Sequence, residues 1–500
     1  MRLPDWLDPL PDAEQMRATD AWAIDERDIP SLELMETAGS GLADLVVEVE
    51  PTGHVLIVCG GGNNGGDGFV AARLLREAGR EVTVALTSDP GRIMGDAKAS
   101  LDRLDGRAPE PFDPAMLDGA AVAVDAILGT GFSGDVREPA RSAIVALSES
   151  EVPVIACDVP SGVDASTGEI ADVTVTAVGT ATFHRAKPGL WIAPGKDRAG
   201  LLRVIDIGIP DGAPAGPQTG VITPRVADIV PRRAAASTKF SSGHVLVVGG
   251  STGLTGAPCL SAEGAMRAGA GYVTCCVPAS LNLVFEQRLL EVMSIPLPDE
   301  DGQLTAAGVD RVLEEAEKRG GAMVVGPGFG KADAAIATAR TLTASAPVPV
   351  VLDADGLNAH AGEIEALSRR PAPTVLTPHG GELARLLGIE SSAVAERRLH
   401  HAREAARRAN AIVVLKGDDT LVVEPEGRVG VSPGGAPALA TAGTGDVLSG
   451  VLAAMLAKRL EPFEAACAAV RLHLDAGRAA ARDRRPDSVI ASDVIDALGR

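Results

Sequence analysis

The chain has 500 residues, of which 46% are apolar and only 2% aromatic, which fits about two or three α/β domains with aliphatic cores. Its formal net charge of −21 argues against nucleic acid or an anionic membrane as a general partner. Six cysteines without CxxC spacing, no signal peptide and no run of about 18 apolar residues predict a soluble, reduced, cytoplasmic protein.

The first predicted βα unit carries a cluster of glycines. Apolar spacing predicts a helix over 31–49 with Ser31 as a possible cap, and a buried strand over 54–59. A glycine-rich loop, 60–68, follows and leads into a helix over 69–77. Strand, glycine loop and helix are typical of a phosphate- or dinucleotide-binding turn, although the loop matches neither GxGxxG nor a P-loop. The amides of Asn63 and Asn64 add groups that can coordinate a cation or bind an amide ligand.

Further strands of this domain end in polar, glycine-bearing loops. Strands are predicted over 81–87, 121–128 and 152–157, with a weaker tail over 180–189 and 201–207. Asp125, Asp135 and Asp158 lie in or directly after these strands. Because ligands of open parallel sheets bind beyond the carboxyl ends of the strands, we expect these loops to converge on one site.

A segment rich in proline and glycine, 210–218, separates this domain from a second α/β alternation. We therefore place the first domain at 1–212, a linker at 213–224 and the second domain at 225–500.

The second domain repeats the pattern of a strand followed by a polar loop. Strands are predicted over 244–248, 272–277, 322–325, 348–352, 375–376 and 412–415, with a helix ending at Arg267. Lys416 is the expected cation for a nucleotide phosphate, and Asp353 and Asp355 are candidates to hold Mg²⁺ through water. His379 is a candidate ligand donor.

Near the end of the chain, a glycine loop runs into an apolar helix that begins at about residue 446. Thr444 or Asp446 is the expected N-cap. The N–H groups of 443–445 and the helix dipole form an anion hole suited to a phosphoryl group. Asp446 is placed there to take a proton from a hydroxyl group that attacks phosphorus. In contrast, His400 and His401 lie in a predicted arginine-rich helix, 393–410, and are expected on its solvated face.

The motifs NNGGDG, VDAILGTGFSGDVREP, DVPSGVD and FHRAKPG closely resemble the NAD(P)H-hydrate epimerase family over about residues 10–210. The resemblance implies a Rossmann-like three-layer sandwich that interconverts the R and S forms of hydrated nicotinamide cofactors with a bound potassium ion. It implies Asn64, Asp125 and Ser161 as potassium ligands and Asp135 as the acid/base. Animal relatives carry lysine where this chain has Ser133. The hydrate-binding residues it implies are Asn63, Asn64, Gly65, Gly66, Asp67, Gly129, Thr130, Gly131, Phe132, Ser133, Gly134, Asp135 and Asp158.

The ordered motifs GGSTGLTGAP, GPGFG, DADGLN, TPHGGE, KGDDT and AGTGDVLSG resemble the ADP- or ATP-dependent NAD(P)H-hydrate dehydratases, members of the ribokinase-like superfamily, over about 225–498. The family usually has proline where Gly380 stands. The resemblance implies two sets of contacts. The hydrate-binding set is Ala257, Gly328, His379 and Asp446, and the nucleotide-binding set is Lys416, Gly417, Asp418, Asp419, Thr420 and Gly445.

The fusion is therefore expected to be an α/β protein of two three-layer domains that repairs NADHX and NADPHX, with potassium in one domain and Mg²⁺ with ADP or ATP in the other. The epimerase would supply the epimer that the dehydratase accepts. Preference for ADP or ATP, and for NADHX or NADPHX, stays open, and a homo-oligomer is expected. The alternative is a kinase of small hydroxyl compounds with a nucleotide-sensing N-terminal domain.

Overall fold

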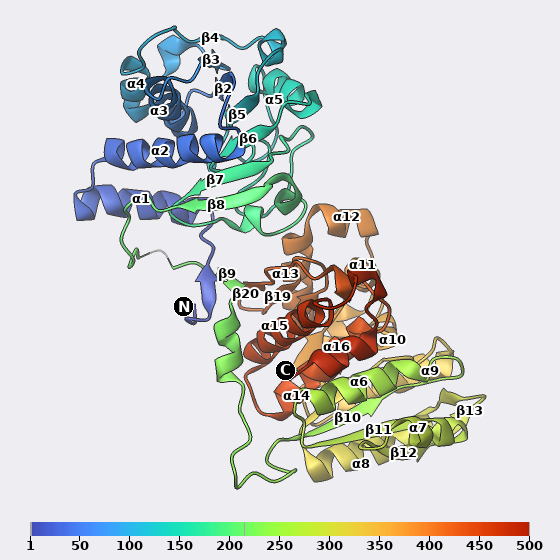
Figure 1. Ribbon diagram of the computed structural model, residues 1–500. Helices are drawn as coiled ribbons and strands as arrows, with labels where there is room; N and C mark the ends of the chain where they lie inside the picture. The colour runs from blue at the N-terminus through green and yellow to red at the C-terminus, as the bar shows by residue number, and fades with distance from the viewer. Residues whose placement is uncertain (1–2, 215, 500) are drawn as a thin grey trace. The chain divides into compact units, whose positions relative to one another are not determined.

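The computed structural model describes residues 3–214 and 216–499 (Figure 1). Two compact units divide the chain: Pro9–Gly220, and Pro4–Asp8 together with Val221–Arg500. The predicted linker, 213–224, includes residue 215, which lies outside the described residues. Residues 1, 2 and 500, at the ends of the predicted domains, lie outside them as well.

The first unit is built on a parallel sheet in the order β4-β3-β2-β5-β6-β7-β8. The chain order reverses between β2 and β5, which is the switch point where ligands bind in doubly wound sheets. The strands are β2 (Val55–Cys59), β3 (Val82–Leu86), β4 (Glu110–Pro111), β5 (Val122–Ala126), β6 (Val154–Cys157), β7 (Gly179–Phe183) and β8 (Leu201–Ile205).

Helices cover both faces of this sheet, so the unit has the three layers expected (Figure 1). Ile57 packs with α2 and α3 in one apolar cluster, whereas its neighbours Leu56 and Val58 pack with α5 in another. This alternation follows from the two-residue period of a strand. The helices are α1 (Ala13–Arg27), α2 (Ser31–Val49), α3 (Asn63–Glu77), α4 (Gly95–Asp102) and α5 (Ala140–Glu149).

Three features of this region differ from the sequence expectation. Helix α1 was missed; Asp12 caps it by accepting a hydrogen bond from Gln15 N at 2.9 Å. Helix α3 begins at Asn63 rather than at Phe69, and Pro30 rather than Ser31 is the N-cap of α2.

The glycines that suggested a flexible loop lie inside α3 because the helix packs closely. A Cβ atom on Gly65 would lie 2.1 Å from Gly60 O, and one on Gly68 would lie 2.8 Å from Cys59 Sγ. Neither residue has a positive φ. The glycines therefore serve close approach of helix and strand rather than left-handed backbone.

The second unit is built on a mixed sheet in the order β1-β9-β20-β19-β18-β17-β16-β15-β10-β11-β12. Strands β10 to β12 and β15 to β18 are parallel to one another. Strand β19 pairs antiparallel with β18, and β20 pairs antiparallel with β19. The order reverses between β10 and β15. The strands are β1 (Leu7–Pro9), β9 (Thr219–Ile222), β10 (His244–Val248), β11 (Tyr272–Pro278), β12 (Met293–Leu297), β15 (Ala322–Val325), β16 (Val350–Leu352), β17 (Thr374–Leu376), β18 (Ile412–Leu415), β19 (Leu421–Val423) and β20 (Val429–Val431), with a separate hairpin of β13 (Asp299–Glu300) and β14 (Gln303–Leu304).

Helices α6, α14, α15 and α16 pack against one another over this sheet (Figure 1). Helices α8 and α9 pack against each other, and α13 packs on β18. Strands β10 and β15 to β18 are buried along their whole length, so both faces are covered. The predicted helix 393–410 is two helices separated at Arg397. The helices are α6 (Gly256–Arg267), α7 (Asn282–Arg288), α8 (Val309–Arg319), α9 (Asp333–Ser345), α10 (Asp355–Asn358), α11 (Gly380–Leu387), α12 (Ser391–Glu396), α13 (Arg398–Ala409), α14 (Thr444–Ala457), α15 (Pro462–Ala480) and α16 (Ala491–Ala497).

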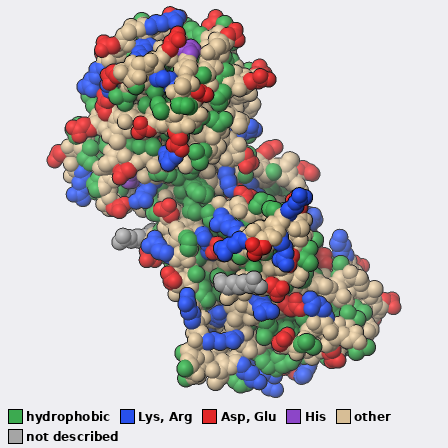
Figure 2. Space-filling view, viewed as in Figure 1, with side chains coloured by type: hydrophobic (Ala, Val, Ile, Leu, Met, Phe, Trp, Pro, Cys, Tyr) green, Lys and Arg blue, Asp and Glu red, His purple; other side chains and the backbone are tan. Residues whose placement is uncertain are grey.

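The surface and the thiols agree with the composition. Acidic and basic side chains are interspersed on the face shown in Figure 2. All six cysteines are buried and free. No helix among residues 3–214 and 216–499 is long and apolar enough to cross a membrane.

The N-terminal segment belongs to the second unit although the chain passes next into the first. Trp6 is 3% exposed, and its ring centroid lies 6.2 Å from that of Phe463, at the start of α15. Trp6 O accepts hydrogen bonds from Thr223 N at 3.0 Å and Thr223 Oγ1 at 2.8 Å. Residues 4–8 therefore complete the core of a unit whose other residues lie more than 200 positions away.

We predict that Trp6→Ala destabilises the second unit selectively. Removing a buried tryptophan typically costs about 3–5 kcal/mol, which lowers the melting temperature of such a unit by on the order of 10 °C. Thermal unfolding, with hydrogen exchange measured by peptide, assigns the loss to a unit. Trp6→Phe should lose less because it keeps an aromatic ring beside Phe463, and faster exchange confined to 9–220 would contradict the assignment.

Candidate active sites of the two units

In the first unit, the loops after β2, β5 and β6 meet at the switch point. A Cβ atom on Gly60 would lie 2.1 Å from Ile127 O, so the first two loops touch through bare backbone. The side chain of Asn64 lies against Gly129, with its Oδ1 2.8 Å from the position of a Cβ there. The backbone N–H of Thr130 donates to Asp158 Oδ2 at 3.2 Å, and the Thr130 hydroxyl donates to the same oxygen. The segments 63–67 and 129–130 and residue 158 therefore lie at one edge of the sheet.

Asp125 and Ser161 form a buried oxygen-rich group below these loops. Both are 0% exposed, and Ser161 donates to Asp125 through its hydroxyl at 2.6 Å and its backbone N–H at 2.8 Å. Burial raises the pKa of Asp125 to about 6, although the hydrogen bonds from Ser161 oppose the shift. The amide nitrogen of Asn64 is buried without a hydrogen-bond partner among the described residues. A buried carboxylate, hydroxyl and amide are the hard donors that suit a potassium ion, so the residues present fit such an ion.

A buried ion pair lies beside this group, and sequence reasoning did not assign its lysine. Lys187 is 1% exposed, and its ammonium group donates to Asp158 Oδ1 at 2.5 Å, to Thr182 Oγ1 at 2.9 Å and to Phe183 O at 3.1 Å. Burial works against ionisation of Asp158, but the charge and hydrogen bond of Lys187 outweigh it and lower the pKa of Asp158. The only sequence signal for Lys187 was its place in FHRAKPG.

Two further carboxyl groups face this ion pair. Burial raises the pKa of Asp67 well above its usual range, and the neighbouring Asp158 adds to the shift. Burial also raises the pKa of Asp20, on α1, to about 6. Asp20 had no motif to mark it. The site thus combines an ionised pair with carboxyl groups that hold their protons more tightly than in water.

The loop 129–135 covers this edge of the sheet and is largely open to solvent. Gly131, Ser133, Gly134 and Asp135 are exposed, and Phe132 is half-buried. Asp135 is therefore accessible to solvent. It belongs to the same loop as Gly129 and Thr130, which contact the other predicted residues. Asn63 is exposed, whereas Gly65, Gly66 and Asp67 are buried in the first turns of α3.

In the second unit, Lys416 joins the loops that follow three strands. Its ammonium group lies 2.9 Å from Asp353 Oδ1, after β16, and 3.6 Å from Glu382 Oε2, in α11 after β17. Ser449 Oγ, on α14, donates to the other oxygen of Asp353 at 2.6 Å. Burial opposes the charge of Lys416, but the two carboxylates outweigh it and raise the pKa of the lysine. Lys416 is thus held charged beneath the start of α14.

The N-terminus of α14 presents the predicted anion hole and base. Gly443, with φ of 91°, is the N-cap in place of Thr444 or Asp446; a Cβ at Gly443 would lie 2.6 Å from Leu260 Cδ1. The position of a Cβ on Gly445 lies 3.4 Å from Lys416 Nζ. Burial raises the pKa of Asp446 to about 7, with Asp353 adding to the shift and Lys416 opposing it. The helix dipole, a lysine and a carboxyl group with a pKa near neutrality therefore meet at one point.

A cavity of about 300 Å³ adjoins this point. Its polar rim includes Lys416, Gly417, Asp418, Thr420 and Gly445, and its walls are mainly apolar side chains of 436–448 and of α15. Such a cavity suits a ligand with an anionic end and a flat apolar end. Asp446 is the next residue after Gly445 but does not line the cavity.

The remaining predicted residues of this unit lie in different surroundings. Asp419 is 3% exposed and pairs with Arg398 at 2.9 Å, so it does not line the cavity. Gly328, with φ of 60°, packs against Leu254 O. His379 is exposed at its side chain and caps α11, because its Nδ1 accepts from Gly381 N at 3.0 Å. Ala257 is half-buried in the first turn of α6.

Of the two carboxylates predicted to hold Mg²⁺ through water, Asp353 is the less suited. It is only 2% exposed, and its carboxylate is already paired with the charged ammonium group of Lys416 besides accepting from Ser449. Asp355 accepts from Gly330 N at 2.9 Å and from Asn358 Nδ2 at 3.4 Å, and it is half-buried. Asp353 therefore orients Lys416, and Asp355 fits the water-mediated role.

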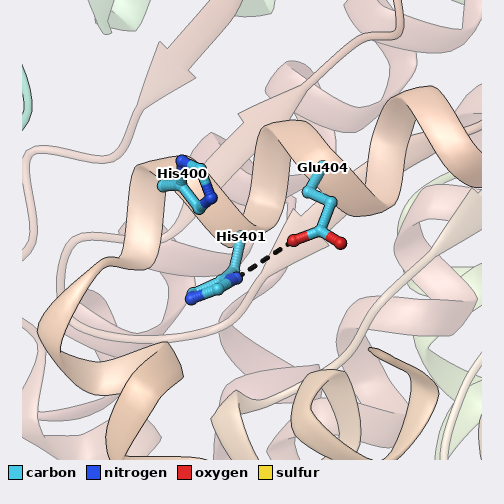
Figure 3. Close-up of side chains that lie close together, drawn as sticks. All are labelled: His400, His401 and Glu404. Carbon is cyan, nitrogen blue, oxygen red and sulfur yellow. Dashed lines mark hydrogen bonds and ion pairs between the residues drawn. The ribbon is translucent and has the colours of Figure 1, made fainter. Parts of the chain in front are cut away.

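His400, His401 and Glu404 of α13 form a separate cluster (Figure 3). His401 is not on the solvated face as expected: its side chain is 12% exposed, and its Nδ1 lies 3.2 Å from Glu404 Oε2. Glu404 Oε1 is occupied by Arg408 at 2.9 Å. We assign no metal to this cluster because an arginine already neutralises its carboxylate.

Comparisons with known proteins agree with the two-part construction. Residues 245–500 match the family model "NAD(P)H-hydrate dehydratase", and residues 31–189 match "YjeF-related protein N-terminus". The chain is 39% identical over 521 residues to the bifunctional NAD(P)H-hydrate repair enzyme Nnr of Salinibacter ruber, covering 98% of this chain and 96% of the relative. It is 38% identical over 505 residues to the same enzyme of Moorella thermoacetica, covering 97% and 95%.

A solved structure, the ADP/ATP-dependent NAD(P)H-hydrate dehydratase of Bacillus subtilis co-crystallised with ATP/Mg²⁺, is 29% identical. The match covers 55% of this chain and 93% of the Bacillus subtilis chain, with a TM-score of 0.46. The two relatives cover nearly the whole chain, and the two family models match its two parts in the same order, so this chain belongs to the family of bifunctional NAD(P)H-hydrate repair enzymes.

Proposed function

We propose that the first unit epimerises R- and S-NAD(P)HX and that the second dehydrates the S epimer to NAD(P)H at the expense of ADP or ATP. These are the two activities of the family to which the chain belongs. We assign the epimerase to 1–212 and the dehydratase to 225–500, with 213–224 as the linker. The observation that carries the dehydratase assignment is the meeting of Lys416, Gly445 and Asp446 beside a cavity of nucleotide size.

Asp446 is the proposed base of the dehydratase. It takes the proton of the C6 hydroxyl, whose oxygen attacks the terminal phosphorus of the nucleotide while the phosphoanhydride bond breaks. A pKa near 7 suits a base that works at neutral pH. Asp446, Ala257, Gly328 and His379 are the proposed contacts of the hydrate.

The N-terminus of α14 is the proposed binding site of the transferred phosphoryl group. The backbone N–H groups of 443–445 and the Lys416 ammonium stabilise its charge. Mg²⁺ bound with the nucleotide would neutralise further charge, with Asp355 as its candidate contact through water. Lys416, Gly417, Asp418, Thr420 and Gly445 line the proposed nucleotide cavity, and Asp419 supports it through Arg398.

Phosphorylation makes the C6 oxygen a good leaving group. The C6–O bond then breaks as the lone pair of the ring nitrogen moves into the ring, and loss of the C5 proton restores the double bond of NAD(P)H. The products are NAD(P)H, phosphate and the shortened nucleotide. A kinase would instead accumulate a phosphorylated product.

In the first unit, we propose that the hydrate binds across the switch point, in contact with the loops of Asn64, Thr130 and Asp158. Asp135 is the proposed acid/base at the nicotinamide ring, and its exposed loop gives it access to a bound ligand. The Lys187–Asp158 pair fixes a carboxylate at the floor of this site. Asn64, Asp125 and Ser161 are the proposed potassium ligands; the ion would supply a positive charge next to a polyanionic substrate.

We also expect a homo-oligomer, which size-exclusion chromatography with light scattering would measure. Small-molecule substrates are the only partners that we propose.

Asp446→Asn and Asp135→Ala should separate the two activities. Loss of a base typically costs on the order of 10²- to 10⁴-fold in rate, so Asp446→Asn should lose dehydration and retain epimerisation. Asp135→Ala should do the reverse. Recovery of nicotinamide absorbance measures dehydration, and exchange between separated epimers measures epimerisation. Parallel loss of both activities in either variant would refute independent sites.

The dehydration rate should depend on the ionisation of Asp446. Only the carboxylate accepts the proton, and burial raises the pKa of Asp446 to about 7. The value of kcat/KM should therefore be flat above about pH 8 and about tenfold below its plateau at pH 6. A profile that stays flat to pH 5 would exclude Asp446 as the titrating base. The epimerisation profile of the same preparation is the control.

Potassium should activate epimerisation through Asp125. In Asp125→Asn the ion loses its one charged ligand, so the concentration for half-maximal activation should rise by about tenfold or more. Ser161 donates to both oxygens of Asp125, and the variant keeps an oxygen for one of these two hydrogen bonds. Epimer exchange is measured in KCl against choline chloride at equal ionic strength. Unchanged potassium dependence in this variant would remove Asp125 from the ligand set, and dehydration is the internal control.

A further inference from the structure

His473 is a buried residue of the cavity that the proposed mechanism does not use. It lies on α15 with Val470 and Leu474, one helical turn apart, and all three side chains line the cavity. His473 is 7% exposed, and its Nε2 atom has no hydrogen-bond partner among the described residues. Leaving a buried polar atom unpaired typically costs about 1–3 kcal/mol, so this atom marks a place where a ligand supplies the partner.

The polar groups of the protein that line the same cavity are already satisfied. The hydroxyl of Thr420 donates to Gly417 O at 2.6 Å. The hydroxyl of Thr444 donates to Leu439 O at 2.7 Å, and Ser432 Oγ accepts from Gly434 N at 3.3 Å. Among these buried wall groups, the imidazole of His473 is the one left to be completed by the ligand.

The state of the imidazole determines what that ligand group must be. Burial lowers the pKa of His473 to about 4, so the ring is neutral at physiological pH. The backbone of Thr444 partly opposes this lowering of the pKa because it favours a ring nitrogen that carries a proton, and Nε2 is the nitrogen without a partner among the described residues. The N–H therefore lies on the side of Thr444, and Nε2 carries a lone pair. It accepts a hydrogen bond and does not donate one.

We propose that His473 is a specificity-determining residue of the second unit, whose Nε2 accepts a hydrogen bond from a donor on the nucleoside of the phosphoryl donor. This inference rests on the proposed function of the cavity as the nucleotide site. The nucleoside of ADP or ATP offers two kinds of donor, the exocyclic amine of adenine and the hydroxyls of ribose. The apolar side chains of Leu439, Leu448 and Leu474 line the same cavity and offer Nε2 no hydrogen-bond donor.

The chemistry of an acceptor makes the selection sharp. A base with a carbonyl oxygen at the amine position would place two acceptors against each other in an apolar wall, and a sugar without the hydroxyl would leave Nε2 unpaired. Either mismatch loses the hydrogen bond to Nε2 and leaves the cost of desolvating Nε2 uncompensated. At a buried site of this kind, the wrong nucleoside loses more binding affinity than it would lose with one hydrogen bond exposed to water.

Nucleotide titrations with the full chain test the proposal. Inosine triphosphate replaces the amine by a carbonyl, and 2′-deoxy- and 3′-deoxy-ATP each remove one ribose hydroxyl. The wild type should bind one of these analogues roughly 10- to 100-fold more weakly than ATP. Weak binding of the inosine analogue identifies the amine as the donor, and weak binding of a deoxy analogue identifies that hydroxyl. Equal affinity for ATP and all three analogues would overturn the proposal.

Variants connect the selection to His473. In His473→Leu the KM for ATP should rise roughly 10- to 100-fold, and the KM for the analogue that the wild type discriminates against should stay unchanged. The kcat at saturating ATP should stay within about threefold of the wild-type value. His473→Gln keeps an acceptor oxygen and should recover part of the discrimination. Val470→Ala, which removes apolar wall from the same cavity, should weaken all four nucleotides alike. Discrimination retained in His473→Leu would overturn the proposal, as would equal weakening of all four nucleotides.

The same experiment separates this inference from the proposed function. If the wild type binds no nucleotide and dehydrates with none, the assignment of the cavity fails. If the wild type uses ATP and His473→Leu behaves as the wild type, only the role of His473 fails. Epimerisation and the melting temperature of each variant report whether the fold is retained.

Discussion

The ion pair between Lys416 and Asp353 is the interaction on which the catalytic end of the second unit depends. A protein with a net charge of −21 repels a polyanionic nucleotide, so it needs a cation that is fixed at the point of phosphoryl transfer. The buried carboxylates Asp353 and Glu382 hold the half-buried Lys416 charged, and Ser449 in turn orients Asp353 from α14. The same carboxylates raise the pKa of Asp446. One set of contacts thus holds the proposed cation for the phosphate and, together with burial, raises the pKa of the proposed base.

The first unit also places a lysine in an ion pair at its proposed site, with different residues. Lys187 is almost fully buried and pairs with Asp158, while Asp67 and Asp20 face the pair with raised pKa values. Removal of either partner of such a pair would leave an unbalanced buried charge, which is far more costly than a broken surface pair. The two proposed sites each combine a lysine paired with an aspartate, a glycine-lined helix N-terminus and a carboxyl group with an altered pKa.

Glycine has different uses in the two sites. In α3, Gly65 and Gly68 lie inside a helix because neighbouring atoms leave no room for a side chain. At the start of α14, Gly443 adopts a φ of 91° that other residues rarely adopt, which lets the chain turn into the helix with its N–H groups uncovered. A glycine-rich sequence therefore indicates close backbone approach, but not whether the segment is helix or loop.

The sequence by itself determined the α/β class, the central strands and the loops that carry the chemistry, because burial in a parallel sheet requires continuous apolar runs and ligands bind where those runs end. Local pattern also predicted Lys416 and Asp446 as site residues, and the family resemblance added the oxygen set of Asp125 and Ser161. Only the tertiary structure decided which distant side chains meet. Lys187 reaches Asp158 across 29 residues, Trp6 joins a core that includes Phe463, and His473 enters a cavity whose other walls come from earlier segments. No short-range periodicity encodes such meetings, since they depend on how separate helices and strands pack.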